Sequence, residues 1–119
     1  AQAYYHATNL AFMHMAYGGD VGEASRFARE TIRHAEAGPR SGKAEHWRVV
    51  SLGDGDFVLG EYTDALEYHQ RAMRERVSAW QALSSQEQAL RLADLRGVED
   101  EVIRRLAAIY VAGRTVAGV

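Results

Sequence analysis

Apolar residues recur at steps of three and four along most of the chain, which is the spacing of one face of an α-helix. The pattern is clearest over residues 22–37, where the recurring positions are Ala24, Phe27, Ala28, Thr31, Ile32 and Ala35. The charged residues between them fall on the opposite side, as in an amphipathic helix. Alternating runs of Val, Ile and Thr bounded by turn residues do not occur. The pattern therefore predicts an all-α chain.

Glycine and proline divide this pattern into six segments. The single proline, Pro39, lies in a glycine-containing loop, and Gly60 and Gly97 close two further segments. We expect helices at about residues 3–17, 22–37, 44–59, 63–77, 79–95 and 99–112. They pair into three antiparallel hairpins within one domain, over about residues 3–37, 44–77 and 79–112.

The boundary between the fourth and fifth segments has the weakest sequence signal. Nothing between Arg74 and Ser85 breaks a helix strongly, so one long helix is the alternative. Ser84 and Ser85, followed by Gln86 and Glu87, resemble the start of a helix more than a nucleophile.

Composition narrows the class of protein. A chain of 119 residues with 47% apolar and 25% charged residues suits one globular domain. The formal charge of −2 disfavours nucleic-acid and membrane-surface partners, which call for a basic stripe. There is no cysteine, which excludes disulfides and thiolate chemistry and fits a reducing, cytoplasmic location. Because the apolar pattern starts at the first residues, we interpret the chain as a fragment of a longer protein.

An internal repeat links two parts of the chain. Residues 19–24 (GDVGEA) align with residues 60–65 (GEYTDA) at an offset of 41. Both copies have a glycine turn, an acidic residue and then a helix that opens with alanine, Ala24 or Ala65. A small side chain suits the crossing point of two helices, because a larger one would push apart axes that pack at about 8–10 Å. The repeat predicts two similar helical hairpins.

The second copy resembles a known repeat family. Residues 60–73 (GEYTDALEYHQRAM) are similar to the second helix of a tetratricopeptide repeat, and Leu52-Gly53 stands where such repeats carry a Leu-Gly pair. The chain departs from the pattern at Asp56, where an aromatic residue is usual, and in its spacing of 41. The resemblance implies a right-handed superhelix of three hairpins, in which the repeat-packing residues are Ala24, Gly53, Gly60, Ala65, Tyr68 and Ala72.

A narrower resemblance concerns the start of the hairpins. Residues 4–11 (YYHATNLA), followed by residues 45–47 (EHW), are similar to the tetratricopeptide-containing TRAFs-binding region of apoptosis signal-regulating kinases and bacterial repeat proteins. The family implies a scaffold that binds protein partners without catalysis. In such folds the first helices line a groove, which places there His6, Asn9, Met13, Tyr17, Trp47, Val50, Asp54 and Phe57. The alternative for Tyr17 and Trp47 is a place in the core between hairpins.

Five acidic residues follow one another without a basic residue between them: Asp54, Asp56, Glu61, Asp64 and Glu67. They favour either a basic partner segment or a solvated surface near the start of a helix, where the helix dipole favours negative charge. The chain lacks the residues of a calcium loop, a phosphate loop or a zinc-protease helix. We therefore expect no catalytic residue, no metal and no cofactor.

These observations lead to a functional hypothesis with alternatives. The first is a non-catalytic helical-repeat scaffold that buries a protein or peptide segment in its groove. The second is a structural segment that stacks on neighbouring repeats or forms a homo-oligomer, because the segment at 3–17 is apolar nearly all round. An enzyme or metal module is a third.

Overall fold

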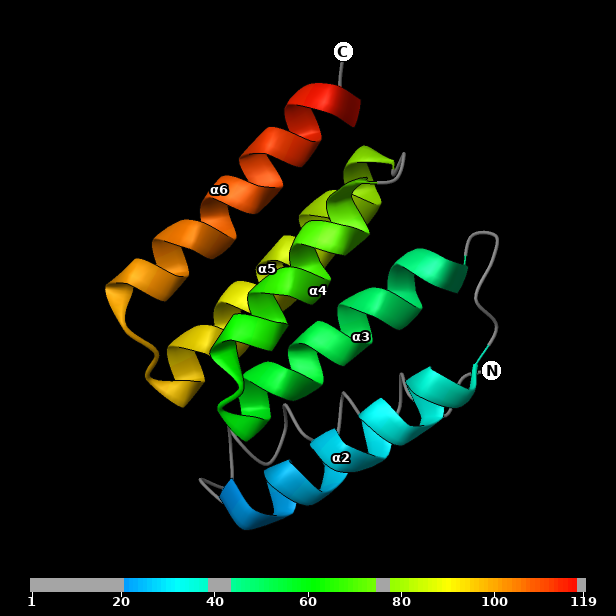
Figure 1. Ribbon diagram of the computed structural model, residues 1–119. Coiled ribbons are helices and arrows are strands. Elements are labelled where there is room, and N and C mark those ends of the chain that lie inside the picture. Colours follow the sequence, from blue (N-terminus) through cyan, green and yellow to red (C-terminus); the bar gives the residue numbers. More distant parts are fainter. Residues whose placement is uncertain (1–20, 39–43, 75–77, 118–119) are drawn as a thin grey trace.

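The computed structural model describes residues 21–38, 44–74 and 78–117, and it folds them into helices (Figure 1). These are α2 (Val21–Ala37), α3 (Ala44–Leu59), α4 (Tyr62–Arg74), α5 (Ala79–Arg96) and α6 (Asp100–Ala117). The described residues contain no strand, so the all-α prediction is confirmed for them. The helix expected at 3–17, and with it His6, Asn9, Met13 and Tyr17, lies outside the described residues.

The helix boundaries follow local sequence signals. α2 begins at Val21 and α4 at Tyr62, which is the offset of 41 in the repeat. Gly60, in the turn between α3 and α4, has a φ of +85°, a left-handed conformation that suits glycine. Gly97 ends α5 in the same way, with a φ of +74°, and its N–H bonds the carbonyl oxygens of Ala93 and Asp94.

α4 and α5 are separate helices. α5 begins after Ser78, whose hydroxyl accepts a hydrogen bond from the backbone N–H of Gln81, while the Gln81 side chain accepts one from the backbone N–H of Ser78. This reciprocal pair is a capping box. The helix start expected at Ser84 and Ser85 is wrong, because both residues lie inside α5.

Four of the helices surround a common core. α3 contacts α4 and α5, and α6 contacts the same two helices, so the four form a closed ring. Figure 1 shows α3 and α5 running in one direction and α4 and α6 in the other, which makes two antiparallel hairpins side by side. α2 packs against α3 outside this ring. The structure thus has two hairpins, α3–α4 and α5–α6, and a further helix.

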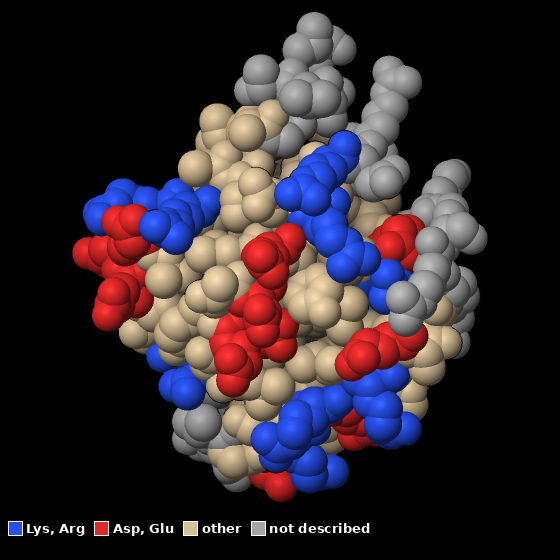
Figure 2. Space-filling model, in the orientation of Figure 1, with Lys and Arg blue, Asp and Glu red and all other residues tan. Residues whose placement is uncertain are grey.

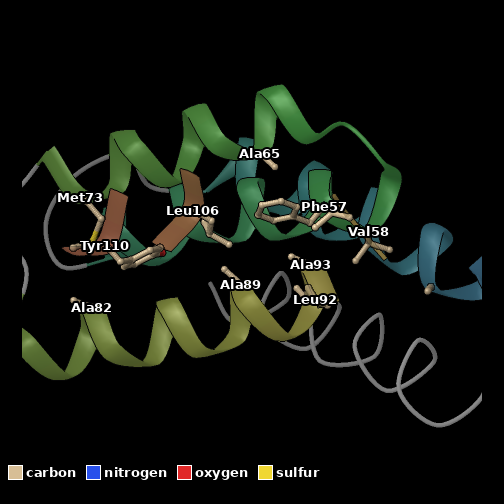
Figure 3. Close-up of a cluster of buried hydrophobic side chains, with 13 residues drawn as sticks. Phe57, Val58, Ala65, Met73, Ala82, Ala89, Leu92, Ala93, Leu106 and Tyr110 are labelled. Carbon is tan, nitrogen blue, oxygen red and sulfur yellow. The ribbon is translucent and has the colours of Figure 1, made fainter. Parts of the chain in front are cut away.

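The core combines a few large side chains with many alanines. Phe57, Leu92, Leu106 and Tyr110 come from α3, α5 and α6 and have almost no exposed surface. Figure 3 shows them between the helices, together with Ala65, Ala82, Ala89 and Ala93. Methyl side chains let the helix axes approach, so the large rings fill the space that remains.

Alanine also occupies the helix starts that the repeat singles out. Ala24 in α2 and Ala65 in α4 are both fully buried. Of the other expected packing residues, Ala72 is buried and Tyr68 is half-buried between two smaller apolar clusters. Because Ala65 is fully buried in the main cluster, a longer side chain there would have to displace its neighbours.

We expect Ala65→Leu to lower the free energy of unfolding by about 1–3 kcal/mol, because the added carbons overpack the contact between α3 and α4. Urea unfolding followed by far-UV circular dichroism measures this change. Glu67→Leu is the matched control, because it adds the same side chain at an exposed position of the same helix. Equal losses in the two variants would contradict the packing of Ala65.

Candidate functional site

A network of polar side chains, three of them buried and one half-buried, joins the four core helices. Asp54 comes from α3, His69 from α4, Gln88 from α5 and Tyr110 from α6. His69 Nε2 lies 3.0 Å from Asp54 Oδ1, and the Tyr110 hydroxyl lies 2.7 Å from His69 Nδ1. Gln88 Nε2 donates to Asp54 Oδ2 over 2.8 Å. Asp54, His69 and Tyr110 have no exposed surface.

The hydrogen-bond partners determine which atoms carry the hydrogens in this network. The Asp54 carboxylate accepts, so Nε2 of His69 carries a proton and donates it. The other ring nitrogen, Nδ1, then accepts from the Tyr110 hydroxyl. Burial raises the pKa of Tyr110 far above its usual range, and the nearby charge of Asp54 adds to the rise. Tyr110 therefore stays a neutral donor.

A second group of buried polar atoms lies beside the first. His46, in the first turn of α3, places Nδ1 3.3 Å from the carbonyl oxygen of Ala72 in α4. Its Nε2 lies 2.9 Å from Ser85 Oγ in α5. His46 is 7% exposed and Ser85 is 1% exposed, and Ser85 also interacts with the Tyr110 hydroxyl. The two groups therefore form one region of polar contacts inside the ring of helices.

Two glycines let other helices pack closely against α3. A Cβ atom at Gly53 would lie 2.6 Å from His69 Cδ2 and 3.2 Å from the Ala65 carbonyl oxygen. At Gly55 it would lie 2.9 Å from Ile32 Cγ1 and 3.2 Å from the Ala28 carbonyl oxygen. Gly53 thus gives the His69 imidazole its place beside Asp54, and Gly55 lets α2 approach the other side of α3.

The buried region is closed and fully paired. Among the described residues, every buried side-chain nitrogen or oxygen has a hydrogen-bond partner. Asp54, His69 and Ser85 combine a carboxylate, an imidazole and a hydroxyl, which are catalytic groups in other settings. Here all three are almost fully buried. The arrangement can position helices, and it can hold protons in fixed places.

Three of the four expected groove residues that the structure describes are core residues. Val50 is 2% exposed, and Asp54 and Phe57 have no exposed surface. The physical reason is that α4 and α5 pack against the side of α3 on which these residues lie. Only Trp47 of the described groove residues keeps partial exposure.

An exposed tryptophan lies next to Trp47. Trp80, near the start of α5, is 63% exposed, and its ring centroid is 5.9 Å from that of Trp47. Leu83, one turn further along α5, is 48% exposed. Trp80 and Leu83 are spaced three residues apart, like the core-facing residues of a helix, yet both are exposed. An isolated apolar residue in a first turn carries no signal that tells a core position from a surface position.

The acidic stretch is divided between interior and surface. Asp54 is buried, whereas Glu61, Asp64 and Glu67 are exposed, and acidic side chains run down the middle of Figure 2, where α4 lies in Figure 1. Asp56 is partly buried, and burial raises its pKa to about 6, with further contributions from the charges of Asp64, Glu61 and Glu36. The surface part of the stretch lies on α4 and the turn before it.

Two shallow depressions flank α4. One, of about 430 Å³, is lined by Tyr68, Arg71 and other polar residues of α4. The other, of about 360 Å³, lies between α4 and α6 and has Leu66, Ala108 and Ile109 along it. Neither brings buried polar groups together as a small-molecule site does.

Two kinds of site are missing from the part of the chain that the structure describes. No three acidic or histidine side chains there are grouped to hold a metal ion. Over the same residues, no helix has the length and apolar character needed to cross a membrane. In comparisons with family models, curated proteins and solved structures, nothing matches the chain.

We expect Asp54→Ala to lower the free energy of unfolding by about 3–5 kcal/mol, because it leaves the buried His69 donor and the half-buried Gln88 donor without an acceptor. Asp64→Ala, at an exposed position, is the control and should change it by less than about 0.5 kcal/mol. Urea unfolding measures both. A small effect at Asp54 would show that the network is not needed for stability.

We expect Gly53→Ala to cost about 1–3 kcal/mol of stability, because the new methyl group meets the His69 ring. The cost should be smaller in a His69→Ala background, where the ring is absent. A double-mutant cycle in urea measures this coupling between Gly53 and His69. Purely additive effects would contradict the close approach.

Proposed function

We propose that this chain is a non-catalytic helical scaffold, built from tetratricopeptide-like hairpins, that binds a protein partner. The partner packs on the surface formed by Trp47, Trp80 and Leu83, which we name the tryptophan surface. The observation that carries the proposal is the 63% exposure of Trp80 beside Trp47. A large ring left in water is costly unless another surface covers it, and tryptophan is the residue type most enriched at the centres of protein interfaces.

The arrangement of helices supports the hairpin part of the proposal. The α3–α4 and α5–α6 hairpins lie side by side with equivalent helices running in the same direction (Figure 1). α2 and α4 begin 41 residues apart and both bury an alanine near their starts. Neighbouring hairpins that bury a continuous core are the building principle of helical repeat proteins. The superhelix and its three hairpins remain part of the proposal.

The location of the polar groups supports the non-catalytic part. The residues with catalytic potential, Asp54, His69 and Ser85, are enclosed, and each has a partner that gives it a structural role. Trp47, Trp80 and Leu83 lie elsewhere, at the ends of α3 and α5 where both helices begin. Binding and architecture therefore use different residues.

Local contacts position the two rings of the tryptophan surface. The Trp47 ring makes a T-shaped contact with the buried ring of His46, with centroids 5.1 Å apart. Trp80 lies two residues after Ser78, whose capping box with Gln81 fixes the first turn of α5. Side chains that are already held lose little conformational entropy on binding, so more of the contact energy appears as affinity. This favours a partner segment that inserts apolar side chains against the two rings.

Self-association is a second candidate, because the same surface can pair with a second copy. Sedimentation velocity at low and high protein concentration separates the two. A dimer that Trp80→Ala abolishes would assign the tryptophan surface to self-association, and a monomer at all concentrations would leave it available for another protein.

We expect Trp80→Ala to weaken partner binding by about 2 kcal/mol, or roughly thirtyfold in Kd. Peptides selected from a displayed random library on the immobilised chain serve as probes, and isothermal titration calorimetry measures their affinity for each variant. Leu95→Ala is the matched control, because Leu95 is an exposed apolar residue in the last turn of the same helix. Selected peptides that bind Trp80→Ala at full strength would refute the proposed surface.

A further inference from the structure

His46 connects the buried polar region to the tryptophan surface. Its two ring nitrogens face the Ala72 carbonyl oxygen of α4 and the Ser85 hydroxyl of α5, while its backbone belongs to α3. The same ring lies nearly perpendicular to that of Trp47, which in turn contacts Trp80. One imidazole therefore ties the start of α3 to two other helices and supports the exposed rings.

The contacts assign the neutral form to this imidazole. A carbonyl oxygen only accepts hydrogen bonds, so Nδ1 carries the proton and donates it to Ala72. Nε2 is then unprotonated and accepts from the Ser85 hydroxyl. In this state both nitrogens are satisfied and no charge is buried at His46.

A second proton would upset this arrangement. Nε2 would become a donor, so Ser85 would have to turn its hydrogen away and accept instead. The resulting cation would be buried at a position that is 7% exposed, without a carboxylate in contact. Asp54 of α3 attracts the charge from a distance and His69 of α4 opposes it, while α5 presents the uncharged Ser85. Burial is the largest influence, so the pKa of His46 lies below its ordinary 6.5.

We propose that His46 is a pH-sensitive latch, whose protonation in mildly acidic solution frees the first turn of α3 from α4 and α5 and rearranges the tryptophan surface. The core around Phe57, Leu92 and Leu106 contains no part of the latch, so the helices persist. The loosening is a property of the free chain. Its effect on a bound partner rests on the proposed function.

The lowered pKa of His46 determines whether the free energy of unfolding rises or falls with pH. The unfolded chain binds a proton at His46 more readily than the folded chain, so the stability from His46 is complete above pH 6.5 and is lost as the pH falls below it toward the folded-state pKa. Asp56 acts in the opposite direction. Its pKa is raised from 3.8 to about 6, so its ionised form costs stability above about pH 6, and this cost is relieved as the pH falls. The free energy of unfolding contains both the His46 and the Asp56 contributions. A signal from the surroundings of His46 is therefore needed to follow His46 alone.

The chain provides such a signal, because it has only two tryptophans and both belong to the tryptophan surface. We measure tryptophan emission and acrylamide quenching on the free chain from about pH 8 to about pH 5, with far-UV circular dichroism in parallel. We expect the emission to shift below pH 6.5 while helicity is retained. His46→Gln, which keeps one donor and one acceptor but takes no proton in this range, should lack the shift. Asp56→Asn and His34→Gln should keep it.

A further variant protects the test against misfolding of His46→Gln. Ser85→Ala leaves His46 titratable but removes the donor that stabilises its neutral form, so the midpoint of the shift should move to higher pH. An absent shift in the wild-type chain, the same shift in folded His46→Gln, or an unmoved midpoint in Ser85→Ala would each overturn the latch. Failure to find a partner peptide would refute the proposed function and leave these measurements unaffected.

Discussion

The burial of the Asp54 carboxylate is the constraint on which the arrangement of the helices depends. A carboxylate without exposed surface is tolerated only where donors reach both of its oxygens. Those donors come from His69 of α4 and Gln88 of α5, and His69 in turn requires Tyr110 of α6. Sliding any one of these helices by a turn would break a link, so the network sets the register of all four. Apolar packing alone tolerates such shifts more readily.

The same constraint explains the unusual sequence of α3. This helix is enclosed on several sides, and it buries polar residues and glycines together with Val49, Val50, Phe57 and Val58. Gly53 and Gly55 each carry a propensity cost of about 1 kcal/mol relative to Ala. The cost is offset because Gly53 admits the His69 ring and Gly55 admits α2. A helix that looks weak by local criteria is thus the centre of the structure.

The helices could be predicted from the sequence, whereas the polar site could not. Periodicity and glycine turns are local signals. They predict nearly every end of the five described helices to within three residues. The exception is the end of α6, which continues to Ala117 although the tail of the sequence has no periodic pattern. The bond between His69 and Tyr110 spans 41 positions and that between His46 and Ser85 spans 39. No single-sequence pattern indicates which distant polar residues pair. The repeat predicts a groove position for Asp54, but position in a repeat does not tell whether a neighbouring helix covers the side chain.

Enclosing the polar residues has a consequence for how this chain can be regulated. A fully buried, paired side chain changes its protonation only when the structure around it opens. An exposed charged side chain changes its protonation without any effect on the fold. His46 lies between these extremes, because it is 7% exposed at the start of a helix and contacts both the interior and Trp47. The start of a helix lacks the flanking turns that hold its middle, so it is the place where a modest energetic penalty produces local movement. A titratable group at this position therefore acts on the surface without dismantling the core.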